Sequence, residues 1–181
     1  MHPLLQDVDR VLIPTEALQK RVAELGAQIS ADYQDLNPLL ICVLKGGYMF
    51  LADLTRALTI RHSIDFMAVS SYGNSTLTTG VVRILKDLDR DITGRHILIV
   101  EDIIDTGHTI AYLLENLRVR GPASIRICTL LSKPSRREVE LKIDYIGFEI
   151  PNEFVIGYGL DFAENYRNLP FIGVLKPDIY S

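Results

Sequence analysis

The densest group of residues able to do chemistry lies in the segment HILIVEDIIDTGHTI, residues 96 to 110. An apolar run leads to the adjacent carboxylates Glu101 and Asp102, and two more apolar residues separate them from a turn, Asp105 to Thr109. The turn carries two threonine hydroxyls and a glycine, and the N–H groups at the start of a following helix attract anions. We therefore predict a phosphate site in the turn, beside carboxylates that can hold sugar hydroxyls, bind Mg²⁺ or move a proton. An acidic helix cap next to a solvated turn is the alternative that these residues alone leave open.

Other patterns for nucleotide or metal sites do not occur in the sequence. No GxxxxGK[ST] string is present, and the pair Gly157 and Gly159 lacks a third glycine because Phe162 stands in its place, so neither a P-loop nor a dinucleotide fold is indicated. Cys42 and Cys128 lie in apolar runs and are expected to be buried, reduced thiols. The histidines have no metal-ligand spacing and are expected at surface or structural positions: His2, His62, His96 and His108.

The elements that must position the turn alternate between helix and strand. Apolar residues at helical spacing behind Thr15, an expected N-cap, predict a helix over 15–33. Short apolar runs predict buried strands, and the periodicity between them predicts helices. The expected order is strand 39–44, helix 48–59, strand 64–70, strand 96–101, helix 109–119 closed by Gly121, and strand 124–131. This order predicts an α/β fold with an open, mainly parallel twisted sheet flanked by helices, in one domain spanning 1–181.

Two segments depart from this alternation. Residues 70–80 (SSYGNSTLTTG) contain no charged residue and are rich in Ser, Thr and Gly, which predicts a mobile loop before an apolar run that begins at Val81. From Asp144 onward, three short apolar runs separated by proline-containing breaks are expected to form a small antiparallel cap on the sheet.

Charge and the first residues narrow the class of protein. There are 19 Lys+Arg against 23 Asp+Glu, with a net charge of −4 and no long block of like charges, which disfavours a partner that is nucleic acid. The opening MHPLLQDVDRVLIP has no basic region followed by an apolar stretch, and no apolar run approaches the length of a membrane span, so neither a signal peptide nor a membrane partner is expected. We expect a cytoplasmic protein.

The string VEDIIDTGHT resembles the phosphoribosyl pyrophosphate signature of the type I phosphoribosyltransferases, and specifically that of the hypoxanthine-guanine phosphoribosyltransferases. Further similarity extends over nearly the whole chain: VLKGG at 43–47, DF and SSY within 65–72, LLSKP at 130–134, and GFEIPNEFVIGYGLDFAENYRNLP at 147–170. The signature marks the superfamily, and the last block behind the lysine of LLSKP marks 6-oxopurine specificity. The resemblance implies the type I fold, with a small hood built from residues near 1–14 and 144–181.

The resemblance also assigns roles around the phosphate turn. It implies that Glu101 and Asp102 hold the ribose hydroxyls and an associated Mg²⁺, and that Asp105 takes the proton from purine N7. It implies that the rest of the turn binds the 5′-phosphate, namely Thr106, Gly107, His108 and Thr109. Some family members have a basic residue in place of His108, but backbone groups hold the phosphate, so this departure changes little.

Pyrophosphate and purine are assigned to residues outside the turn. The resemblance places pyrophosphate on Lys45, Gly46 and Arg167, and it gives Ser71 and Tyr72 of the loop a role in a lid over the reacting centre. It implies that the purine contacts Lys133 at its 6-oxo group, the ring of Phe154, the backbone of Val155, and Asp161 with a second Mg²⁺. Simpler readings stay open: a surface position for Lys45, core packing for Phe154 and Val155, a solvated turn of Lys133 with Arg136 and Arg137, and a surface pair of Asp161 with Arg167.

The implied reaction is Mg²⁺-dependent transfer of the 5-phosphoribosyl group from phosphoribosyl pyrophosphate to N9 of hypoxanthine or guanine, which yields IMP or GMP in purine salvage. A homo-oligomer, dimer or tetramer, is expected. Two alternatives remain, namely a sibling enzyme that prefers xanthine and an RNA-binding attenuation regulator on the same fold. The regulator would need a basic face, which the net charge of −4 disfavours.

Overall fold

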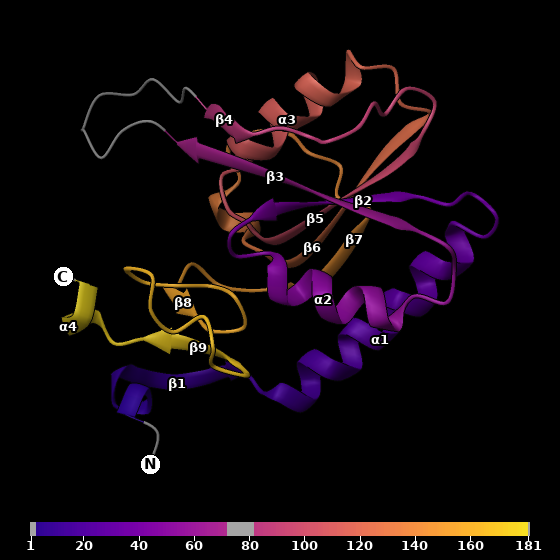
Figure 1. The fold of residues 1–181 in the computed structure, drawn as a ribbon. Helices are drawn as coiled ribbons and strands as arrows, with labels where there is room; N and C mark the ends of the chain where they lie inside the picture. Colours follow the sequence, from indigo (N-terminus) through magenta and orange to yellow (C-terminus); the bar gives the residue numbers. More distant parts are fainter. Residues whose placement is uncertain (1–2, 72–81, 181) are drawn as a thin grey trace.

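The computed structural model describes residues 3–71 and 82–180, and its centre is a six-stranded sheet (Figure 1). The strand order is β4-β3-β2-β5-β6-β7, and all neighbouring pairs are parallel except β3 with β4. The strands are β2 (Leu39–Leu44), β3 (Ser63–Ser71), β4 (Val82–Lys86), β5 (His96–Ile104), β6 (Ser124–Ser132) and β7 (Tyr145–Glu149). The predicted open, mainly parallel α/β sheet is confirmed.

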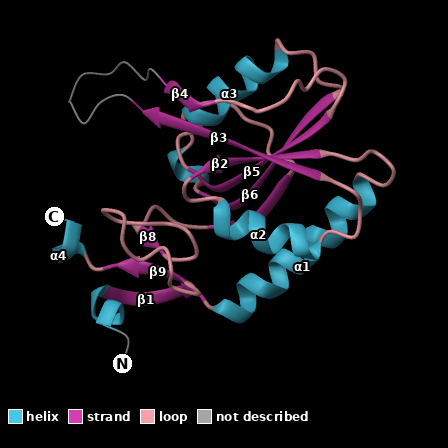
Figure 2. Cartoon of the chain, in the orientation of Figure 1, coloured by secondary structure: helices cyan, strands magenta, loops and turns pink. Residues whose placement is uncertain are grey.

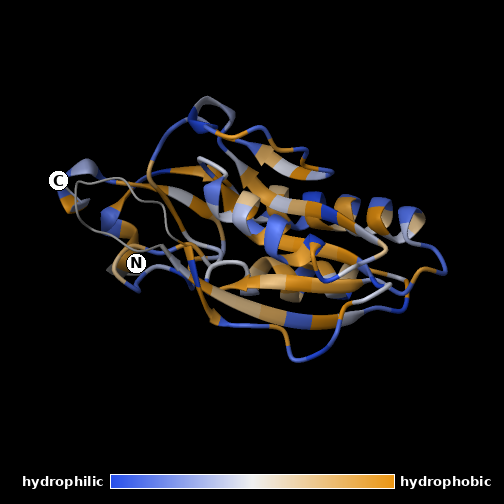
Figure 3. Cartoon of the chain, turned by 90° about the horizontal axis from the view of Figure 1, so that it is seen from above, coloured by the Kyte–Doolittle hydropathy of each residue, from blue (hydrophilic) through white to orange (hydrophobic). Residues whose placement is uncertain are grey.

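Helices cover both faces of this sheet (Figure 2). Helices α1 (Thr15–Asp32) and α2 (Tyr48–Ala57) pack on one face, and α3 (His108–Arg118) packs on the other. Along β2, Leu40 and Cys42 therefore belong to the core under α1 and α2, while Leu39 and Ile41 belong to the core under α3. Because both faces are covered, β2 is apolar throughout and β5 and β6 are apolar over most of their length, and the strands of the sheet are mostly orange in Figure 3. Cys42 and Cys128 are both buried and free, as predicted.

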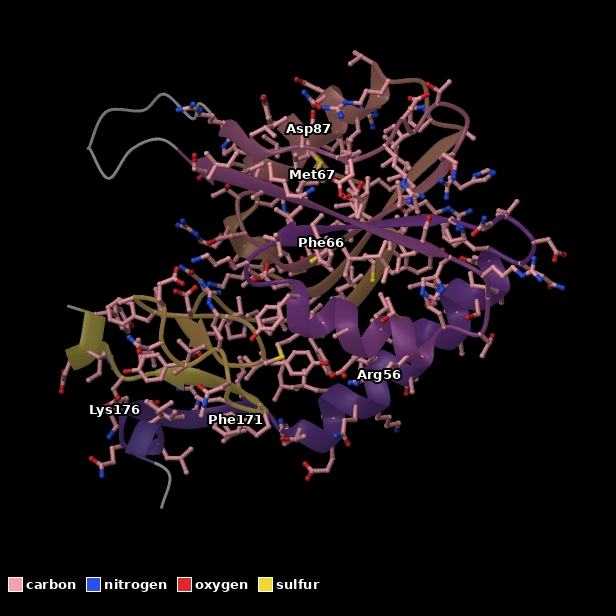
Figure 4. All side chains as sticks on the ribbon, viewed as in Figure 1. Arg56, Phe66, Met67, Asp87, Phe171 and Lys176 are labelled. Carbon is pink, nitrogen blue, oxygen red and sulfur yellow. The ribbon has the colours of Figure 1, made fainter. Side chains whose placement is uncertain are left out.

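A second, smaller sheet joins the two ends of the chain. Its order is β1-β9-β8, all antiparallel, with β1 (Val8–Ile13), β8 (Val155–Ile156) and β9 (Ile172–Leu175). The short helices η1 (Pro3–Asp7) and α4 (Pro177–Tyr180) flank it, and the ammonium of Lys176, labelled in Figure 4, donates to the Gln6 carbonyl at 2.6 Å. We call β1, β8, β9 and the turns between β8 and β9 the hood.

The hood starts later than the sequence indicates. Everything from Asp144 was expected to form an antiparallel cap, but β7 pairs parallel with β6 and is the edge strand of the main sheet. Asp144 anchors it, since the Asp144 carboxylate accepts from the Ile127 N–H at 2.9 Å. Gly147 completes the fit, because a Cβ there would lie 2.4 Å from the Leu130 carbonyl oxygen.

Three local expectations are also wrong. Thr15 does not cap α1: the N-cap is Pro14, and the Thr15 hydroxyl donates to the Pro170 carbonyl at 2.9 Å. Helix α2 ends at Ala57, two residues before the predicted end. Strand β5 continues to Ile104, three residues past the predicted end at 101, so Asp102 lies inside the strand instead of after it. None of the helices in the described part of the chain has the length and apolar character needed to cross a bilayer.

Candidate active site

A cavity of about 290 Å³ lies where β2 and β5 end side by side at the carboxyl edge of the main sheet. Carboxyl edges of this kind are where open α/β sheets bind small molecules. Eight of the residues predicted from the sequence line it: Lys45, Gly46, Glu101, Asp102, Asp105, Thr106, Gly107 and Thr109. The fold thus brings the Lys45–Gly46 loop and the phosphate turn, which are far apart in the chain, to one place.

The two adjacent carboxylates are strongly desolvated. Glu101 is 6% exposed, and burial together with the charge of Asp102 raises its pKa well above the ordinary value. Burial raises the pKa of Asp102 to about 6, although the Ile103 N–H, which donates to its Oδ1 at 2.8 Å, acts in the opposite direction. Carboxylates held in this way gain from a cation or from hydroxyl donors placed against them.

Gly46 lies directly against Asp102. A Cβ on Gly46 would fall 1.6 Å from Asp102 Oδ2, so only glycine leaves room for the carboxylate. The peptide bond between Leu44 and Lys45 is cis. Gly46 lets the backbone of the VLKGG segment approach the Asp102 carboxylate on β5 closely.

The phosphate turn is supported from behind by the segment that follows β6. Gly107 has φ of 92° and caps α3, a left-handed conformation that favours glycine. The Glu138 N–H donates to the Thr106 carbonyl at 3.0 Å, and a Cβ on Gly107 would meet side chains of Val139 and Leu141 at 2.8 and 2.7 Å. His108 does not line the cavity: it is exposed, and its Nε2 lies 2.8 Å from a Glu138 carboxylate oxygen. The structure thus gives no support to a phosphate contact by its ring.

Asp105 has a cationic partner that sequence reasoning missed. Arg136 Nε lies 3.2 Å from Asp105 Oδ1, with the two side chains 45% and 42% exposed. Arg137 turns inward instead, and its Nη2 donates to Ser132 Oγ at 3.1 Å. In the sequence, Arg136 and Arg137 enter only the alternative of a solvated turn with Lys133, and their spacing gives no sign of the contact with Asp105.

Lys133 is buried, which removes the simpler reading of a solvated lysine. Its side chain is 8% exposed, and its backbone N–H donates to the Ile104 carbonyl at 3.0 Å. Burial lowers the pKa of the ammonium, while the nearby charge of Asp105 acts in the opposite direction. No group within residues 3–71 and 82–180 forms a hydrogen bond or ion pair with the ammonium.

Phe154, the aromatic predicted to stack on the purine, lies directly before β8 and does not line the cavity. The Phe154 ring is stacked on Tyr180 at 4.9 Å between centroids and meets Phe162 edge-on at 5.6 Å. It remains 37% exposed, whereas the Val155 side chain is buried in the core at 6%. Tyr180 was not predicted, because nothing in the sequence links the last residues to Phe154.

Asp161, Arg167 and Lys45 meet through a fourth residue, Glu164, that was not predicted either. Arg167 Nη2 lies 2.9 Å from Asp161 Oδ1 and 3.3 Å from Glu164 Oε1, and Lys45 Nζ lies 2.9 Å from Glu164 Oε2. The acidic and basic residues recur at spacing three from 161 to 167, which is the only sign of this cluster in the sequence.

The predicted metal ligands do not form a ready-made set. Within the described residues, no group of three or more His, Cys, Asp or Glu side chains is arranged to hold a metal ion, and Asp161 is paired with Arg167. Of the predicted lid residues, Ser71 ends β3, while Tyr72 and the following loop up to residue 80 lie outside the described residues.

Comparison with known proteins places this chain in a family. The family model of the phosphoribosyl transferase domain matches residues 12–163. The chain is 56% identical to the hypoxanthine-guanine phosphoribosyltransferase of Bacillus subtilis (strain 168) over 174 residues, which cover 96% of this chain and 97% of the relative. It is 53% identical to the protein of the same description from Mycobacterium bovis, with 96% and 89% covered. Among solved structures, a hypoxanthine phosphoribosyltransferase from Staphylococcus aureus matches with a TM-score of 0.96 and 46% identity over 100% of this chain and 99% of that chain.

Proposed function

Because the chain belongs to the hypoxanthine-guanine phosphoribosyltransferases, within the phosphoribosyl transferase family, we infer that it is a pentosyltransferase of purine salvage. It transfers the 5-phosphoribosyl group of phosphoribosyl pyrophosphate to N9 of hypoxanthine or guanine. The products are IMP or GMP and pyrophosphate. The observation that carries this function is the cavity in which the Lys45–Gly46 loop, the Glu101–Asp102 pair and the Asp105–Thr109 turn meet.

The phosphoribosyl group is held by the turn and the paired carboxylates. Backbone N–H groups of the turn at the start of α3 receive the 5′-phosphate, helped by the hydroxyls of Thr106 and Thr109. The carboxylates of Glu101 and Asp102 accept hydrogen bonds from the ribose hydroxyls. Their burial favours this use, because each desolvated carboxylate is stabilised by every donor that it gains.

Asp105 takes the proton that purine N7 loses as N9 forms its bond to C1′ and the bond from C1′ to pyrophosphate breaks. The carboxylate must first leave Arg136, and this exchange is easy because the pair is half-exposed.

Lys133 reads position 6 of the purine. An ammonium has three donors and no acceptor, so it binds a 6-oxo group and opposes the amino group of adenine. Phe154 supplies a flat face for the ring, and the backbone of Val155 together with Asp161 completes the ring-edge contacts. The burial of Lys133 and the partial exposure of the Phe154 ring support these assignments.

Pyrophosphate lies against Lys45, the backbone at Gly46, and Arg167. Mg²⁺ commonly binds through one or two carboxylates plus substrate oxygens, so it does not need three protein ligands arranged in advance. Glu101 and Asp102 would hold one ion beside the ribose, and Asp161 would hold a second. When bound, Mg²⁺ neutralises the charge that builds up on the leaving pyrophosphate.

We further propose that the enzyme acts in the cytoplasm as a homo-oligomer, dimer or tetramer. The two buried, free cysteines suit a reducing compartment.

The function is tested by measuring nucleotide formation from phosphoribosyl pyrophosphate and Mg²⁺ with hypoxanthine, guanine, xanthine and adenine in turn. We expect hypoxanthine and guanine to react, and adenine to be at least about 10²-fold poorer in kcat/KM, because its amino group leaves two donors facing each other. Fastest turnover of xanthine would identify the xanthine-preferring sibling instead. No turnover of any purine would overturn the proposal.

A further inference from the structure

One carboxylate, that of Glu164, bridges both of the side-chain cations that we assign to pyrophosphate. Its Oε2 accepts from Lys45 Nζ at 2.9 Å, and its Oε1 lies 3.3 Å from Arg167 Nη2. Each oxygen thus takes one cation, which is how two oxygens of a phosphate group would be shared between them. The hydrogen bond from Lys45 lowers the pKa of Glu164, so the bridge is ionic at neutral pH.

The backbone of the hood holds Glu164 in this place. Residue 164 has φ of 65°, and its N–H donates to Asp161 Oδ2 at 2.8 Å, so residues 161–164 form a tight turn. The same turn region is fixed against the Lys45 loop at Gly159, where a Cβ would lie 2.1 Å from the Gly46 carbonyl oxygen. The contact therefore joins two segments that are separated by 119 residues in the chain.

The bridge does little for stability. The side chains of Lys45 and Glu164 are both 66% exposed, and exposed ion pairs of long side chains contribute little to folding. Arg167 does not depend on Glu164, since it also donates to the Gly159 carbonyl at 2.7 Å and pairs with Asp161. An exposed pair between two anchored segments can thus open without disturbing the fold.

We propose that Glu164 is an internal counterion that occupies the pyrophosphate cations of the free enzyme and is displaced when pyrophosphate, alone or as part of phosphoribosyl pyrophosphate, binds. This inference rests on the proposed function, because that function assigns Lys45 and Arg167 to pyrophosphate. Displacing Glu164 offsets part of the attraction between the anion and the two cations. Glu164 therefore weakens the binding of pyrophosphate, and it assists release of pyrophosphate by returning to the cations.

The test compares binding of inorganic pyrophosphate, in the presence of Mg²⁺, by isothermal titration to the parent protein and to Glu164→Gln, Glu164→Asp and Glu115→Gln. Glu115 is exposed on α3, so its variant removes the same charge away from the cluster. We expect Glu164→Gln to bind pyrophosphate about 3- to 10-fold more tightly, in line with the loss of two exposed ion pairs. Glu164→Asp, which keeps the charge on a shorter side chain, should lie between Glu164→Gln and the parent, and Glu115→Gln should match the parent.

Steady-state kinetics give a second measurement that a purely structural role would not produce. We expect KM for phosphoribosyl pyrophosphate to fall in Glu164→Gln while kcat stays constant or falls, because tighter pyrophosphate leaves more slowly. Equal or weaker binding of pyrophosphate by Glu164→Gln would overturn the counterion proposal and leave the proposed function intact. If the parent itself does not bind pyrophosphate, the assignment of Lys45 and Arg167 fails, and the counterion role fails with it.

Discussion

Replacement of Lys133 by methionine should stabilise the fold while it damages catalysis. Lys133 is 8% exposed, burial lowers the pKa of its ammonium, and the ammonium has no hydrogen-bonding or ionic partner among the described residues. An unpaired buried donor costs about 1–3 kcal/mol, and more when it is charged. Methionine keeps an unbranched side chain of similar length and removes the charge. We therefore expect Lys133→Met to raise the free energy of unfolding by about 1–3 kcal/mol, with Tm rising roughly 2–4 °C for each kcal/mol.

The same change removes the group that we propose to bind the 6-oxo group of the purine. A hydrogen bond from a charged donor is worth about 1.5–3 kcal/mol, so kcat/KM for hypoxanthine should fall by roughly 10- to 150-fold. Discrimination against adenine should narrow as well, because the opposing donor disappears with the favourable one.

Stability is measured by urea unfolding followed by circular dichroism, since the chain contains no Trp. Lys142→Met is the matched control, because the Lys142 side chain is 90% exposed and its loss should change stability by no more than about 0.5 kcal/mol. Activity is measured as kcat/KM for hypoxanthine, guanine and adenine on both variants and the parent.

The pH dependence of the free energy of unfolding gives a further check on whether the charged Lys133 destabilises the fold. Burial places the pKa of Lys133 in the folded protein below its ordinary value of 10.5, so the unfolded chain binds the proton more tightly. The penalty is therefore present in full below the folded pKa and disappears as the pH rises to 10.5. The gain from Lys133→Met should be larger at pH 7 than at pH 10.

Two results would refute this reasoning. A Lys133→Met protein that is less stable than the parent at pH 7, with Lys142→Met unchanged, would mean that the ammonium has a favourable partner. An unchanged ratio of kcat/KM for hypoxanthine to that for adenine would mean that Lys133 does not read position 6.

Three more outcomes are expected. Asp105→Asn should lower kcat on the order of 10²–10⁴-fold with KM for phosphoribosyl pyrophosphate nearly unchanged, because the change removes the proton acceptor and keeps the backbone of the turn. Steady-state kinetics with hypoxanthine test this, and a kcat within about threefold of the parent would exclude Asp105 as the base. Asp102→Asn should stabilise the free protein by up to about 3 kcal/mol above pH 6 and not at all below pH 3.8, since burial raises the pKa of Asp102 from 3.8 to about 6. Unfolding curves at pH 8 and pH 3.5 test this, and an equal gain in stability at both pH values would contradict it. Gly159→Ala should lower the free energy of unfolding by at least about 2 kcal/mol in thermal unfolding, because residue 159 combines φ of 100° with the close Gly46 carbonyl. Gly94→Ala, with φ of 70° and open space around it, should lower it by only about 1–2 kcal/mol. Equal losses would show that the contact with Gly46 does not contribute.

The elements that depend on local pattern could be predicted, and those that depend on distant neighbours could not. Strand β2 has the predicted bounds because six apolar residues between a proline and a Lys-Gly-Gly stop allow little else. Strand β5 was predicted too short because carboxylates normally end a buried strand. Here β6 runs alongside past them, with Ile103 opposite Leu131 and Ile104 opposite Ser132, so the pairing continues.

The candidate site divides in the same way. The phosphate turn and its carboxylates lie within nine residues of one segment, 101–109, and their relation was therefore visible in the sequence. The contact of Glu164 with Lys45, the pairing of Arg136 with Asp105 and the stacking of Tyr180 on Phe154 all depend on which loops meet in space. Residue spacing carries no information about such meetings.

The arrangement of the hood has a consequence during synthesis of the chain. Its middle strand, β9, is the last strand to be made, while β1 is the first, so β1 has no strand partner until the main sheet has been synthesised. Chains grow from the N-terminus and fold in parts as they appear. A ribosome-bound chain that stops before Phe171 already contains every strand of the main sheet and the phosphate turn, but its hood strands β1 and β8 lack the strand between them. The growing chain thus contains the proposed site for the sugar phosphate before the hood is complete.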